Sequence, residues 1–113
     1  MQIKIGTLTY QVKLKPLDQI IGNKSGITLK TDDKYAMGGI NVACLEIELA
    51  EEMPKDKILN TLWHEIIHGI IYAYGIKNEN EEEYCRLMST ILIQLIKDNE
   101  KLIEKTLHNE DFK

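Results

Sequence analysis

The sequence predicts an α+β fold in which a small, mostly antiparallel sheet packs on two long helices. Two observations support this prediction. Apolar residues alternate with polar residues over parts of the first 49 positions, which is the period of a strand with one buried face. From position 55 onward they recur every three or four residues, which is the period of an amphipathic helix. Strands followed by helices indicate helices gathered on one side of a small sheet.

The first predicted element is a β-hairpin over residues 1–14. Its apolar residues alternate on both sides of a break at Gly6-Thr7, and Pro16 ends the second strand. No linker rich in Pro, Gly or Ser follows anywhere in the chain. The 113 residues, 43% of them hydrophobic, suffice for one modest core. We therefore expect residues 1–113 to form a single domain.

The middle of the chain is less regular. Residues 17–24 are compatible with a helical turn, residues 27–30 with a short strand and residues 31–34 with a turn. Two consecutive glycines at 38–39 are predicted to break the chain again. Residues 40–49 then alternate well enough to predict one further strand.

Two helices are predicted in the second half. The first covers residues 55–74, because Pro54 suits the start of a helix and Gly75 its end. The second begins at residues 78–81, which resemble a capping box, and runs to about Leu107. The apolar stripe expected to face inward on this second helix consists of Tyr84, Leu87, Met88, Ile91, Leu95 and Leu102.

Composition excludes several classes of function. The net charge of -4 and the scattered lysines argue against nucleic acid as the main partner, because phosphate binding needs clustered basic residues. No apolar run is long enough to cross a membrane, and the N-terminus lacks the pattern of a signal peptide. The cytoplasm is the expected compartment.

Cys44 and Cys85 are then expected to be reduced, and each is interpreted as a small core residue.

Candidate metal ligands lie on the first predicted helix. His64 and His68 are four residues apart, so their side chains project about 40° apart on one helical face. Two imidazoles so placed can share one Zn²⁺ at about 2.0–2.1 Å. Glu65 lies beside them and is predicted to be the general base that activates a water molecule at the metal.

The alternative is that both histidines are ordinary surface or core residues. Against this, the residues around them, Leu62-Trp63 and Ile66-Ile67 among others, are apolar nearly all round the helix. Such a helix is buried, and buried polar groups need partners. A shared metal ion would supply a partner for both imidazoles, so we favour the metal site.

A catalytic zinc needs a third protein ligand. Glutamates open the second predicted helix, and most of them are expected simply to face solvent at the helix start. If the apolar stripe faces inward, Glu81 lies about 60° from it, whereas Glu82 points nearly opposite and Glu83 lies off its other edge. Glu81 is therefore the predicted ligand, with Glu82 and Glu83 as alternatives. His108 is a weaker candidate.

These residues resemble a known family. The run at 59–70, which contains His64, Glu65 and His68, followed by a helix opened by glutamates, resembles gluzincins. More narrowly, it resembles the short ImmA/IrrE-like metallopeptidases of phages and mobile elements, as do residues 39–41 and 95–99. In the gluzincin pattern Glu81 matches the ligand. Tyr84 and Cys85 depart from the small and the acidic or amide residues that follow it, which weakens the expected support of the first histidine.

The resemblance implies a minimal zincin-like fold and a zinc-dependent metallopeptidase, with Zn²⁺ as cofactor and a peptide or protein as substrate. It also suggests residues 44–49 as an edge strand against which the peptide lies, although an ordinary structural strand is an equal alternative. Three other functions remain open: a zinc-binding regulatory or interaction protein without proteolysis, another zinc hydrolase such as a deformylase using Cys44, and a helical module without metal. No nucleic-acid or membrane partner is expected, and the oligomeric state is not predicted.

Overall fold

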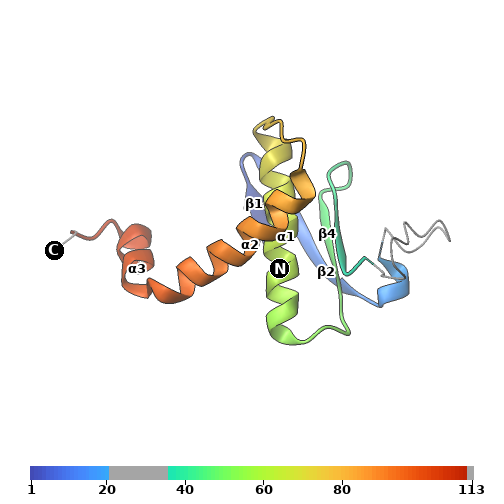
Figure 1. Ribbon diagram of the computed structural model, residues 1–113, viewed down its shortest axis with the longest axis horizontal. Coiled ribbons are helices and arrows are strands. Elements are labelled where there is room, and N and C mark those ends of the chain that lie inside the picture. The colour runs from blue at the N-terminus through green and yellow to red at the C-terminus, as the bar shows by residue number, and fades with distance from the viewer. Residues whose placement is uncertain (21–35, 112–113) are drawn as a thin grey trace.

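The computed structural model describes residues 1–20 and 36–111 (Figure 1). Its strands are β1 (Gln2–Ile5), β2 (Leu8–Lys15), β3 (Gly38–Asn41) and β4 (Glu46–Ala50). A short 3-10 helix, η1 (Leu17–Gln19), follows β2, and the α-helices are α1 (Lys55–Ala73), α2 (Glu81–Asp98) and α3 (Glu100–His108). The fold is α+β, as predicted.

The four strands form one sheet in the order β1-β2-β4-β3. β1 and β2 form the predicted antiparallel hairpin, with Gly6 at a φ of 60° in the turn, a conformation that favours glycine. β2 pairs with β4 in parallel, and β4 pairs with β3 antiparallel. The sheet is thus mostly antiparallel. The elements predicted within residues 21–35 lie outside the described residues.

The strand predicted over residues 40–49 is wrong in one respect, because the chain forms a β3–β4 hairpin there. Asn41 turns the chain by accepting a hydrogen bond from the Cys44 backbone N–H at 3.1 Å, and Leu45 adopts a positive φ of 56°. The apolar residues shift from even to odd positions between Cys44 and Leu45, within the turn, and Ile40 pairs directly with Ile47. The edge of the sheet is therefore β3, and the expectation that residues 44–49 form an edge strand is wrong.

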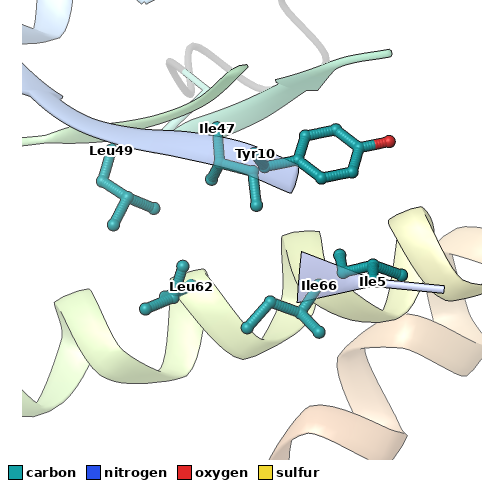
Figure 2. Close-up of a cluster of buried hydrophobic side chains, with 6 residues drawn as sticks. All are labelled: Ile5, Tyr10, Ile47, Leu49, Leu62 and Ile66. Atoms are coloured by element: carbon teal, nitrogen blue, oxygen red, sulfur yellow. The ribbon is translucent and has the colours of Figure 1, made fainter. Parts of the chain in front are cut away.

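Helix α1 lies across the sheet and builds the main core with it (Figure 2). Side chains of Ile5, Tyr10, Ile47 and Leu49 from the strands face Leu62 and Ile66 of the helix. Gly69 permits close approach, since a Cβ there would lie 2.8 Å from Cδ1 of Ile5 and 3.1 Å from Cδ1 of Ile40. This packing fixes the histidine-bearing helix against β3.

Helix α2 packs against α1, crosses it, and extends beyond the rest of the molecule (Figure 1). Its buried contacts come from Cys85, with Met88 and Leu92 beside it, against Ile67 and Ile71 of α1. The predicted inward stripe is largely wrong, because α2 meets α1 through a face centred on the small residue at 85. The exposed members of that stripe are Tyr84, Leu87, Ile91, Leu95 and Leu102.

The second predicted helix is interrupted at Asn99, so its prediction as one helix to Leu107 is wrong. Asn99 leaves the helical conformation, with φ -131° and ψ 48°. Its side-chain amide donates a hydrogen bond to the Leu95 carbonyl at 2.9 Å. Asparagine competes with helical backbone bonding in this way. The predicted capping box, with Asn78 as its capping residue, also fails: α2 begins only at Glu81, and the Asn78 side chain accepts a hydrogen bond from the Asn80 backbone N–H at 3.0 Å.

Candidate metal centre

The two histidines of α1 lie side by side, as their spacing predicts. The ring centroids of His64 and His68 are 5.0 Å apart, and the ring planes meet at 65°. Both side chains are mostly buried. Ligand atoms of His64, Glu65 and His68 all lie within 4.8 Å of one another, so these three residues form a group that could hold a metal ion.

Glu65 is the buried member of this group, with 6% of its surface exposed. Among the described residues its carboxylate makes no hydrogen bond or ion pair, and it lines a hollow beside His64 rather than being sealed in the core. Burial raises the pKa of Glu65 to about 7; the nearby His68 lowers it and the charge of Glu82 raises it. A carboxylate with a pKa near neutrality is suited to accept and release a proton.

The first turn of α2 brings two carboxylates to the histidines. Glu82 spans both rings: its Oε1 lies 2.6 Å from Nε2 of His64, and its Oε2 lies 3.0 Å from Nε2 of His68. Glu81 contacts the other nitrogen of His68, with its Oε2 2.6 Å from Nδ1. Both glutamates are thus at the site, but they meet different imidazole atoms.

The remaining candidates lie elsewhere. Glu83 pairs with Arg86 on the surface of α2. His108 is exposed at the end of α3. Cys44 is exposed in the β3–β4 turn, so its interpretation as a core residue is wrong, whereas Cys85 is buried as expected. Neither cysteine belongs to the His64–Glu65–His68 group.

Helical geometry could have placed Glu82 correctly had the inward face of α2 been known. Cys85 and Ser89 are the fully buried residues of this helix. Glu81 and Glu82 precede Cys85 by four and three residues, so both lie one turn before it on the same face. The signal in the sequence is the pair of small residues at positions 85 and 89, both of which are buried, and Cys85 packs against Ile67 and Ile71 of α1.

The cluster concentrates negative charge around the imidazoles. Burial alone would lower the pKa of His68, but its hydrogen bond to Glu81 and the charges of Glu65, Glu82 and Glu81 outweigh this effect and raise the pKa. Carboxylates beside both ring nitrogens stabilise the protonated, positively charged imidazole of His68. The same negative charges would stabilise a metal cation bound beside the imidazoles.

The donor set fits a zinc ion. Imidazole nitrogen and carboxylate oxygen both bind Zn²⁺, at about 2.0–2.2 Å in tetrahedral sites, which separates neighbouring ligand atoms by roughly 3.3–3.5 Å. The Glu82 oxygens lie 2.6 Å and 3.0 Å from the two Nε2 atoms. Small outward side-chain movements would therefore admit the ion, and the exposed Glu82 is free to make them.

Two hollows flank the cluster along β3. One, of about 360 Å³, lies between the start of β3 and α1 and is lined by Ala36, Met37, Gly38, Thr61, His64, Glu65 and Glu82. The other, of about 460 Å³, is more apolar, with His68 and Glu81 at its border and Ile40, Val42, Ile71, Tyr72 and Ile76 among its lining residues. The cluster is thus open to molecules on both sides.

No family model, curated protein or solved structure matches this chain. The resemblance to gluzincins therefore rests on the residues of the chain itself. Within the described residues, no helix is long and apolar enough to cross a membrane.

Proposed function

We propose that the protein is a zinc-dependent hydrolase that cleaves peptide bonds. Its metal site consists of His64, His68 and a carboxylate from the first turn of α2, and Glu65 is its general base. The observation that most supports this function is the convergence of two Nε2 atoms and a carboxylate beside Glu65. A buried carboxylate with no hydrogen bond among the described residues and a pKa of about 7 is unusual for a structural residue.

A bound zinc ion would polarise the scissile carbonyl and lower the pKa of the attacking water. Glu65 takes a proton from that water as the water oxygen bonds to the carbonyl carbon. When the C–N bond breaks, the same carboxylate returns the proton to the departing amine. The position of Glu65 on the wall of the hollow beside His64 suits both transfers.

An extended peptide is the substrate that the surroundings favour. β3 is the terminal strand of the sheet, with β4 on one side and no other strand on its outer side among the described residues. Such an edge can bind a peptide through backbone hydrogen bonds. The hollows on either side of the cluster would then receive peptide side chains. Cys44 and Cys85 are unpaired, which is compatible with the reducing cytoplasm as the compartment.

Substitution of the base tests this function. We expect Glu65→Gln to keep zinc and to lose cleavage of a mixed library of unstructured peptides by about 10²–10⁴-fold, because the amide cannot accept the proton. Mass spectrometry of the products measures cleavage, and Glu79→Gln, an exposed residue before α2, is the matched control.

Retained cleavage in Glu65→Gln would contradict the role of Glu65. A wild-type protein that binds zinc but cleaves no peptide would instead favour the alternative, a zinc-binding regulatory or interaction protein.

A further inference from the structure

We infer that Glu82 is the third protein ligand of the metal, and that Glu81 is a positioning residue that orients His68. This inference rests on the proposed zinc site and assigns different tasks to two neighbouring glutamates. It differs from the sequence prediction, in which Glu81 was the ligand.

Glu82 is placed as a ligand by the atoms it faces. Its two oxygens lie 2.6 Å and 3.0 Å from the Nε2 atoms of His64 and His68, so the three side chains converge on one point. Glu82 is the only carboxylate in the described part of the chain that contacts both rings. Its side chain is 77% exposed, so it has the freedom to adjust around an ion.

Glu81 meets the opposite side of His68. Its Oε2 lies 2.6 Å from Nδ1, and a carboxylate only accepts hydrogen bonds, so Nδ1 carries the proton. In a neutral imidazole this leaves the lone pair on Nε2. Nε2 of His68 then faces the Glu82 oxygen at 3.0 Å with a lone pair that a metal ion could use, and the carboxylate would share that ion. A carboxylate behind a metal-binding histidine is a recurring arrangement.

The packing of α2 explains why the two tasks fall on adjacent residues. Cys85 and Ser89 are fully buried, and Cys85 packs against α1. The turn before them therefore lies close to His64 and His68, with neighbouring side chains reaching different ring nitrogens. Glu83, one residue further, is directed to Arg86 and does not take part.

Metal-binding measurements on single variants test this assignment. Zn²⁺ affinity is measured by competition with a chromophoric chelator, and the coordination of Co²⁺ by its visible absorption spectrum. We expect Glu82→Ala to weaken Zn²⁺ binding by more than about 100-fold and to change the Co²⁺ spectrum, because a ligand is lost. Glu81→Ala should weaken binding by about 10–100-fold while leaving the Co²⁺ spectrum close to that of the wild type.

Two further variants complete the test. Glu81→Gln should recover most of the affinity, because its amide oxygen still accepts the Nδ1–H hydrogen bond. Glu83→Ala is the matched control and should change affinity by less than about threefold, since an exposed ion pair contributes little. Because residues 81–83 are not buried, circular dichroism should show the same helix content in all variants.

Two results would overturn the inference. If Glu81→Ala changes the Co²⁺ spectrum and Glu82→Ala does not, Glu81 is the ligand and the assignment is reversed, while the proposed function stands. If wild-type protein binds neither Zn²⁺ nor Co²⁺, the proposed function fails and this inference fails with it.

Discussion

The three carboxylates at the site differ in their surroundings, and these differences set what each can do. Glu65 is buried and has no hydrogen-bond partner in the described part of the chain, and burial raises its pKa. Glu81 accepts a hydrogen bond from one histidine, and the exposed Glu82 bridges two. Of the three, Glu65 is the carboxylate whose surroundings suit the proposed transfer of a proton.

Cysteine reactivity tests the packing of α2 beside these carboxylates. Cys85 is fully buried, and burial, together with the charges of Glu81, Glu82 and Glu65, raises its pKa to about 12. Because the thiolate is the reactive form, a raised pKa keeps Cys85 protonated until the pH approaches this value. Cys44 is exposed. At pH 8 we expect a disulfide reagent to label Cys44 rapidly and Cys85 only after unfolding.

The variant Cys44→Ala is the control, and it should show almost no labelling under native conditions. Equal rates at both thiols in the native protein would mean that α2 does not bury Cys85 against α1.

Some site residues were predictable from the sequence and others were not. The shared face of His64 and His68 follows from a spacing of four within one helix, so no knowledge of the fold was needed. The choice between Glu81 and Glu82 depends on how α2 is rotated against α1, and the exposed apolar residues Tyr84, Ile91 and Leu95 suggested the wrong rotation.

Among the elements, the contact between β3 and α1 shapes the hollow next to the candidate metal site. Gly38 lies at this contact: a Cβ there would come within 2.8 Å of Cγ2 of Thr61 and 3.0 Å of the Glu48 carbonyl oxygen. Thr61 is one turn before His64 on α1. The spacing between the edge strand and the histidines therefore depends on the absence of a side chain at position 38.

Substitution of adjacent glycines tests this contact. We expect Gly38→Ala to lower the free energy of unfolding by about 1–3 kcal/mol, because the added methyl group overpacks the interface. Gly39→Ala is the matched control: a Cβ there meets nothing within 4 Å, and its stability should change little. Chemical denaturation measures both, and equal stability of the two variants would contradict the close approach of β3 to α1.

Local signals predicted some elements well. The alternating hairpin around Gly6 and the helix between Pro54 and Gly75 have their start and stop residues in the sequence itself. The β3–β4 hairpin was missed because the alternation shifts by only one residue between Cys44 and Leu45, and a bulge within a single strand would produce the same shift. The break at Asn99 was missed because one side-chain hydrogen bond decides it.

For the whole molecule, the candidate metal site joins two parts of an elongated chain. The principal extents are 55, 31 and 27 Å, and the long one reflects the projection of α2 and α3 away from the sheet (Figure 1). α2 packs mainly on α1, with few buried residues of its own. A zinc ion bound by histidines of α1 and a glutamate of α2 would crosslink these helices and stabilise the folded state.

The most direct test of the metal site is the zinc content of purified protein, measured by inductively coupled plasma mass spectrometry. The wild type should contain about one zinc per chain after dialysis against zinc-free buffer, and the His64→Ala/His68→Ala double variant should contain almost none. A wild type without zinc after incubation with excess Zn²⁺, or a double variant with the same content as the wild type, would contradict the proposed centre.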